Sequence, residues 1–323
     1  MWPTFKIEGI LCNKATLDEE DQTMLGITLV LSGFLSSLFN GWLIGCLFLR
    51  SEFLSQFHLL FMNLSIACLG HNLLAGFPFQ GTSAISRRWL FGKHCCQLFA
   101  SLDKFFNNVE VLASILIILE RYSSNHLDKL GNKFYFYAVL SSWIASMVYA
   151  SLPFFDISKF VCDAAGISCS LDWHPQKQVD QLYIAVYIII SVLPTLVICG
   201  LKIQEKCQKR KYNLRTDDDQ ITEAVTMMII LMQISWIPSG LVSLFSLINI
   251  RLPKALVFMA PIANTISTAI PFITIFCYDQ EVRRKLLGTL QRRQGWKMRR
   301  LAIKKYRRNP SPCSIDDRSN SHC

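Results

Sequence analysis

The chain has 323 residues, of which 51% are hydrophobic and only 17% are charged, and its mean hydropathy is +0.31. This apolar excess excludes an ordinary soluble domain of this length and indicates a membrane protein. The net charge of +10 lies almost entirely in the tail after Tyr278, where thirteen Lys and Arg accompany four Asp and Glu. Because the sequence contains no HExxH or GxSxG motif, we expect no enzyme with its own metal or nucleophile.

Seven segments are apolar and long enough to cross a membrane as helices, since one span needs about 20 mostly apolar residues. In chain order they cover residues 24–49, 56–79, 96–121, 134–156, 181–203, 222–249 and 255–277. The sequence therefore predicts an all-α membrane protein, built as a bundle of seven transmembrane helices in a lipid bilayer.

The charges between the spans predict the orientation of this bundle. Residues 1–23 hold five Asp and Glu against two Lys, whereas the connection KIQEKCQKRKYNLR and the tail are basic. Basic segments stay in the cytoplasm, so we expect the N-terminus outside and the C-terminus inside, which agrees with seven passes.

We divide the chain into an extracellular N-terminus (1–23), a seven-helix domain (24–278), a juxtamembrane amphipathic helix (279–292) and a basic, largely disordered cytoplasmic tail (293–323). In the short helix, Leu286, Leu287 and Leu290 can insert into the inner leaflet while the cations face anionic lipids. A basic tail in solution is the alternative. We expect this charge to face lipid, and we expect no nucleic-acid partner.

The third span contains the polar stretch SLDKFFNNVE, residues 101–110. Asp103, Asn107, Glu110 and Ser114 follow one another at helical spacing, and Arg121 continues the same face toward the cytoplasm. An unpaired charge inside a membrane costs about 2.5–3.5 kcal/mol on insertion scales. This face is therefore predicted to contact other helices or water and not lipid.

Several spans carry a distinctive residue or motif. These are Asn40 in the first, Cys96 and Glu120-Arg121-Tyr122 at the two ends of the third, Trp143 in the fourth, Pro194 in the fifth, Ser235-Trp236-Ile237-Pro238 in the sixth and Pro271 in the seventh. In this order they resemble the class A, or rhodopsin-like, G-protein-coupled receptors over residues 24–290. Within that class, the stretches SRRWLFGKHCC and SCSLDW resemble the opsins, and most of all the neuropsins (opsin-5).

The resemblance implies a receptor of the plasma membrane that signals to a heterotrimeric G protein. Cys96 at the outer end of a helix and Cys169 in the long outer loop are suited to a disulfide that holds the loop over the bundle. Cys95 and Cys162 could form a second bridge or compete for the first, because sequence alone does not assign connectivity.

In this family the arginine that matches Arg121, within Glu120-Arg121-Tyr122, pairs with an acid at the foot of the sixth span and is released on activation. Asp218 aligns with that acid, and such a pair would be a two-state element that a ligand could bias. The alternative is an arginine that extends from a helix end into water. Trp236 is implied to form the floor of the ligand pocket, with a plain core tryptophan as the alternative.

One ligand-binding position departs from the opsin pattern. The lysine that carries retinal in opsins is replaced by Asn264, whose amide cannot form an imine. Lys254 lies ten residues earlier, about 15 Å along the helix, and is expected at the outer rim. We therefore expect no certain cofactor, and retinal only without the usual Schiff-base lysine.

Two further departures concern the signalling positions. The second span has Cys68 where an aspartate is usual, and the seventh ends in Ile270-Pro271-Phe272-Ile273-Thr274 in place of Asn-Pro-x-x-Tyr. A degenerate opsin that no longer signals is therefore one alternative. A retinal photoisomerase or carrier that uses another lysine is a second.

Three interpretations of the third span remain open. Asp103 could bind a cationic ligand together with Asn264, with Asn107 in the same pocket; Lys104 could replace the retinal lysine; or Asp103 could neutralise Lys104 as a structural pair. Glu110 lies where related receptors line a sodium pocket, opposite Cys68. It could act there as a sodium ligand or as a protonated hydrogen-bond donor.

Overall fold

The computed structural model describes residues 17–48, 56–126, 131–163, 165–173, 177–212, 219–248 and 250–278, together with Arg283. Residues 1–278 form one unit, and the elements named below belong to it. The predicted amphipathic helix 279–292, Arg283 apart, and the tail 293–323 lie outside the described residues.

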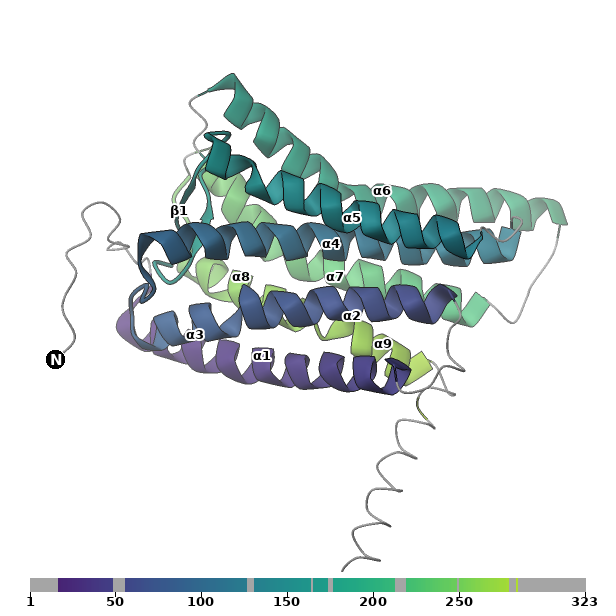
Figure 1. Cartoon of the computed structure of the whole chain (residues 1–323), viewed down its shortest axis with the longest axis horizontal. Coiled ribbons are helices and arrows are strands. Elements are labelled where there is room, and N and C mark those ends of the chain that lie inside the picture. The colour runs from purple at the N-terminus through teal and green to yellow at the C-terminus, as the bar shows by residue number, and fades with distance from the viewer. Residues whose placement is uncertain are drawn as a thin grey trace, which may run out of the picture. The chain divides into compact units, whose positions relative to one another are not determined.

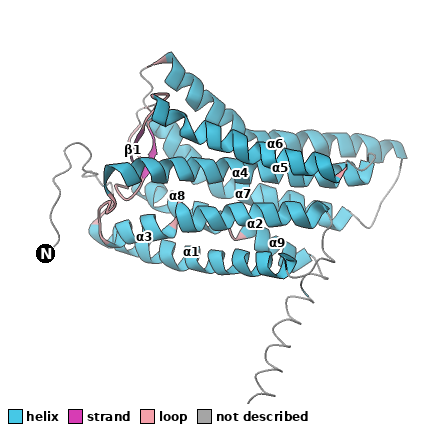
Figure 2. Ribbon diagram, viewed as in Figure 1, coloured by secondary structure: helices cyan, strands magenta, loops and turns pink. Residues whose placement is uncertain are grey.

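The described chain is almost entirely helical, with one two-stranded hairpin at the end of the bundle that also holds the start of α4 (Figures 1 and 2). In order, the elements are α1 (Glu19–Phe48), α2 (Gln56–Leu74), α3 (Phe77–Ile85), α4 (Gly92–His126), α5 (Asn132–Ser151), the 3-10 helix η2 (Leu152–Phe155), β1 (Phe160–Cys162), β2 (Cys169–Leu171), α6 (Gln178–Tyr212), α7 (Asp219–Leu247), α8 (Lys254–Ser267) and α9 (Ile270–Tyr278).

Each of the seven predicted spans is mostly helical where the structure describes it. Within the described residues, five stretches are apolar and long enough to cross a membrane, and the bent pair of α8 and α9 supplies a sixth. The remaining span is α4, the third in chain order. It has 35 residues but is more polar, because it carries Asp103, Lys104 and Glu110 in its middle. The first helix begins at Glu19, before the predicted boundary at residue 24, and has three acidic residues in its first turn.

Two predicted spans are not continuous helices. The second breaks at Gly76, where the backbone leaves the helical region and a Cβ would lie 2.7 Å from the carbonyl oxygen of Asn72. The seventh bends by 43° between α8 and α9, just before Pro271. Proline has no N–H and its ring disturbs the preceding turn, which explains why the helix changes direction here.

Thr268 lies at this bend and is held by polar groups from α1 and α2. The Asn40 amide donates to its carbonyl oxygen at 2.8 Å, and the Asn72 amide donates to its hydroxyl oxygen at 2.8 Å. The Ser36 and Thr268 hydroxyls are also 2.8 Å apart. These buried hydrogen bonds satisfy backbone and side-chain groups that have no partner within the interrupted helix.

The helices α2 and α4 pack closely along their length. A Cβ added at Gly70 would lie 2.3 Å from Cε1 of Phe106, so the missing side chain lets the two backbones approach. Nearby, the Trp143 indole of α5 donates to Oδ1 of Asn63 on α2 at 2.8 Å. These contacts fix the face of α2 that holds His71 against the polar face of α4.

A disulfide joins Cys96 at the start of α4 to Cys169 in β2, with a Cα–Cα distance of 5.4 Å. This is the predicted bridge, and it ties the hairpin to the bundle. The strands are antiparallel, and Cys162 pairs in register with Cys169. Cys162 is itself disulfide-bonded, whereas Cys95 is a free thiol, so Cys95 takes part in neither bridge.

Candidate functional site

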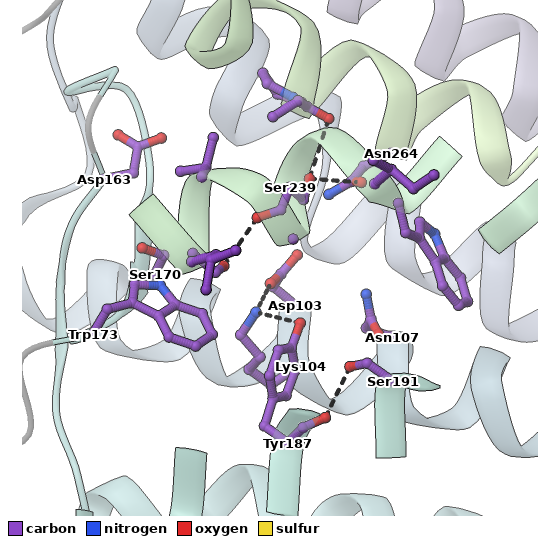
Figure 3. A pocket seen from close by; sticks show the side chains of 18 of the residues that line it. Asp103, Lys104, Asn107, Asp163, Ser170, Trp173, Tyr187, Ser191, Ser239 and Asn264 are labelled. Carbon is purple, nitrogen blue, oxygen red and sulfur yellow. Dashed lines mark hydrogen bonds and ion pairs between the residues drawn. The ribbon is translucent and has the colours of Figure 1, made fainter. Parts of the chain in front are cut away.

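A cavity of about 420 Å³ lies beneath the hairpin, between α4, α6, α7 and α8. Its apolar wall includes Trp173, Ile188, Trp236, Leu244 and Leu247. Its polar wall includes Asp103, Lys104, Asn107, Gln233 and Asn264, and Figure 3 shows four of these around one space. An apolar cavity with a few converging polar groups is the usual form of a small-molecule site.

Asp103 and Lys104 form an ion pair on the cavity wall, with Oδ2 of the carboxylate 3.3 Å from Nζ. Lys104 Nζ also donates to the Tyr187 hydroxyl at 3.3 Å and lies 4.6 Å from the centre of the Tyr187 ring. Figure 3 shows the carboxylate and the hydroxyl on two sides of the ammonium. The structural pair proposed from the sequence is therefore present.

Behind this pair, His71 connects Asp103 to Glu110. Its Nε2 lies 3.2 Å from Oδ1 of Asp103, and its Nδ1 lies 2.9 Å from Oε1 of Glu110. Glu110 is fully buried, and its Oε2 has no hydrogen-bond partner among the described residues. Four ionisable groups from α2 and α4 thus form one chain, which we call the charge chain: Glu110, His71, Asp103 and Lys104.

Among the described residues, the charge chain accounts for all Asp, Glu, Lys, Arg and His side chains at the centre of the bundle. The sequence has none of these residue types in 22–48, 134–151, 181–201, 224–247 or 255–278, which supply the other helices. Lys104 and His71 are 7% and 8% exposed. Removing such charges from water is costly, and their mutual pairing offsets that cost.

The opposite wall of the cavity comes from α7 and α8. The Ser239 hydroxyl donates to Oδ1 of Asn264 at 2.9 Å, which joins the two helices. The Trp236 indole donates to the Ser267 hydroxyl at 3.1 Å. Trp236 and Asn264 both line the cavity. Each is also held by a hydrogen bond between α7 and α8.

At the other end of α4, Arg121 forms a bidentate ion pair with its neighbour. Its Nε and Nη2 donate to the two carboxylate oxygens of Glu120 at 2.6 and 2.8 Å. The guanidinium also lies 4.2 Å from the centre of the Phe57 ring of α2. Tyr122 follows in the same helix. Asp218, the predicted partner, lies outside the described residues, so that pairing stays a prediction.

Asp163 and Lys254 have structural partners at the outer end. The Asp163 carboxylate accepts hydrogen bonds from the backbone N–H groups of Ile167 and Ser168 and from the Ser168 hydroxyl, which closes the turn of the hairpin. Burial raises the pKa of Asp163, and these hydrogen bonds act in the opposite direction. Lys254 pairs with Asp18 at 2.7 Å and is exposed, as expected at the rim.

The structure places the five predicted ligand-pocket residues at one cavity, and it adds residues that the sequence did not reveal. His71, Tyr187 and Ser239 were missed. One signal was present for His71, because it follows Cys68 by three residues and so shares its helix face opposite Glu110. Described residues form no group of three or more His, Cys, Asp and Glu suited to a metal ion, and the sodium role of Glu110 stays a prediction.

Comparisons with known proteins give one consistent result. The family model described as 7 transmembrane receptor (rhodopsin family) matches residues 39–293. The visual pigment-like receptor peropsin of Mus musculus is 20% identical over 281 residues, covering 82% of this chain and 83% of that protein. Opsin-5 of Homo sapiens is 23% identical over 249 residues, covering 71% and 70%. The crystal structure of squid rhodopsin shares the fold, with a TM-score of 0.72 at 17% identity, covering 85% and 87%.

Proposed function

The chain belongs to the rhodopsin family of seven-transmembrane receptors, and from this premise we propose that it passes a signal from a ligand in the outer cavity to a heterotrimeric G protein. The protein is an opsin-like, multi-pass membrane receptor. We place it in the plasma membrane. We also propose that its basic tail contacts anionic lipids of the inner leaflet.

The observation that carries this proposal is the position of the cavity relative to α4. One wall of the cavity contains Asp103 and Lys104, and the same helix carries Glu120 and Arg121 in its second half, five or six residues before its end at His126. A ligand that alters the charge chain would therefore act on the helix that presents Arg121 to the cytoplasm. The Glu120–Arg121 ion pair is an element whose rearrangement can report ligand binding.

Retinal, if it binds, is proposed to bind without a Schiff base at position 264. Asn264 has no amine, and its amide oxygen already accepts a hydrogen bond from Ser239. One observation favours a second candidate, a retinal photoisomerase: Lys104 lines the cavity, and its amine could carry the aldehyde. Its contacts with Asp103 and Tyr187 favour the ammonium form, which is not nucleophilic, so we rank this candidate second.

Two measurements test these proposals. The purified protein is mixed with 11-cis and all-trans retinal, and its visible absorbance is recorded before and after hydroxylamine. We expect no hydroxylamine-sensitive band, whereas a band that Lys104→Ala abolishes would favour the photoisomerase.

Nucleotide exchange on a panel of purified G proteins tests signalling. Arg121→Ala should abolish exchange, and Arg251→Ala, which removes an exposed arginine from the outer end, should leave it unchanged. Exchange that is equal with and without the receptor, across the panel, would contradict G-protein signalling.

A further inference from the structure

We propose that the cavity binds a neutral, largely apolar molecule whose oxygen atom accepts a hydrogen bond from Lys104. The proposal rests on the proposed function, because it names the chemistry of the ligand that the receptor would sense. It differs from both ligand interpretations drawn from the sequence, which require a cation at Asp103 or an imine at Lys104.

The ion pair at the wall argues for a neutral ligand. A cationic or anionic headgroup placed beside Asp103 would also lie beside Lys104, because their charged atoms are 3.3 Å apart. The attraction from one partner is then largely cancelled by repulsion from the other. A charged ligand would lose its hydration in the cavity without gaining a net charge partner, so a neutral headgroup is favoured.

Asp103 is also poorly placed to anchor an ammonium group, because each of its oxygens already has a partner. Oδ1 contacts Nε2 of His71 at 3.2 Å, and Oδ2 contacts Nζ of Lys104 at 3.3 Å. An ammonium ligand would have to share or displace these contacts. If the ligand displaced His71 from Asp103, the imidazole would lose one of its two carboxylate partners and would keep only Glu110, which is fully buried.

Three polar side chains that line the cavity retain hydrogen-bond donors. The Lys104 ammonium has three N–H groups and two partners among the described residues, Asp103 and the Tyr187 hydroxyl. The Gln233 amide nitrogen is buried and has no partner in the described part of the chain. The Asn264 amide uses its oxygen for Ser239 and keeps its N–H groups.

These donors come from three helices that line one cavity, and Figure 3 labels Lys104 and Asn264 among the side chains of this lining. A carbonyl, ester or hydroxyl oxygen of the ligand would satisfy the remaining Lys104 N–H without adding charge. The rest of the ligand would lie against Trp173, Ile188 and Trp236 on the apolar wall. A neutral oxygen acceptor on a hydrocarbon body therefore matches both the polar and the apolar lining.

Four retinoid probes with one hydrocarbon skeleton test the headgroup: methyl retinoate, retinoate, retinylamine and the hydrocarbon analogue that lacks oxygen. Binding to the full-length receptor in phospholipid nanodiscs is measured by quenching of tryptophan fluorescence, since Trp173 and Trp236 line the cavity. We expect methyl retinoate to bind most tightly. Lys104→Met should weaken it roughly tenfold to a hundredfold, the effect of losing one hydrogen bond to a charged donor.

Lys104→Gln keeps an N–H donor, so it should bind methyl retinoate more tightly than Lys104→Met does. It also tests the proposal if Lys104→Met does not fold. Lys254→Met is the matched control, because Lys254 is 58% exposed in its side chain and pairs with Asp18 outside the cavity. Tighter binding of retinylamine or retinoate would overturn the proposal. So would equal binding of the hydrocarbon analogue and the ester, or no saturable binding of any probe.

This binding assay contains no G protein, so its result is separate from that of the signalling assay. Binding with the expected headgroup preference but without nucleotide exchange would leave the ligand assignment standing and contradict signalling. Nucleotide exchange that responds to amines only would contradict the ligand assignment and leave signalling standing.

Discussion

Replacing His71 with leucine should destabilise the receptor strongly, because this imidazole is the connection between two buried carboxylates. Its ring nitrogens lie 2.9 Å from Glu110 and 3.2 Å from Asp103. After the substitution Asp103 keeps Lys104, but Glu110 has neither solvent nor its His71 partner. Removing one member of such a buried pair costs about 3–5 kcal/mol, well above the effect of a surface pair.

The double variant His71→Leu/Glu110→Leu gives a sharper test than the single substitution. Glu110→Leu alone leaves His71 in contact with Asp103, and it should cost about 1–3 kcal/mol. Once both groups are gone, no carboxylate is left unpaired at position 110. The double variant should therefore be more stable than the sum of the single effects implies, by about 1–3 kcal/mol.

The assay is chemical unfolding of the purified receptor in detergent micelles, followed by circular dichroism. His58→Leu, on the same helix near its other end, controls for a general effect of replacing histidine in α2. Single and double effects that add to within about 0.5 kcal/mol would refute the reasoning, because independent sites are additive within that range.

Three further predictions concern the helix bend and the hairpin. Thr268→Val removes the hydroxyl that accepts a hydrogen bond from the Asn72 amide, so it should lower the free energy of unfolding by about 1–3 kcal/mol. The measurement is the melting temperature, which should fall. An unchanged melting temperature would contradict the role of the contacts at the bend. Cys169→Ser should cost about 2–4 kcal/mol and speed proteolysis of the hairpin, while Cys95→Ser, at a free thiol, serves as the control. Because burial raises the pKa of Asp163, the folded hairpin binds this proton more tightly than the unfolded chain, so the unfolding midpoint should fall as pH rises through that pKa. Asp163→Asn should reduce this pH dependence, and a variant with the parent's pH profile would count against it.

The sequence predicted the parts of the fold that depend on one helix at a time. Apolar length located the seven spans, and helical spacing placed Asp103, Asn107 and Glu110 on one face of α4. The bend between α8 and α9 was not predicted, because a proline in an apolar segment is compatible with a kink, a break or a continuous helix.

The partners of the polar face depended on how two helices pack against each other. A single histidine in an apolar helix has no periodic pattern of its own, so His71 gave little signal. Its position opposite Glu110 follows from the close approach of α2 and α4 at Gly70, which is a property of the packed bundle. The hydrogen bond from Lys104 to Tyr187 likewise joins two helices, and its residues are 83 positions apart in the sequence.

The polarity of α4 has a consequence for how the receptor is made. A helix with Asp103, Lys104 and Glu110 at its centre partitions poorly into lipid by itself, since each charge costs about 2.5–3.5 kcal/mol on insertion scales. The helix that supplies His71 precedes α4 in the chain, so it is synthesised first and is already available when α4 emerges from the ribosome. We therefore expect α2 and α4 to integrate into the bilayer as a pair, so that His71 affects membrane biogenesis as well as the finished receptor.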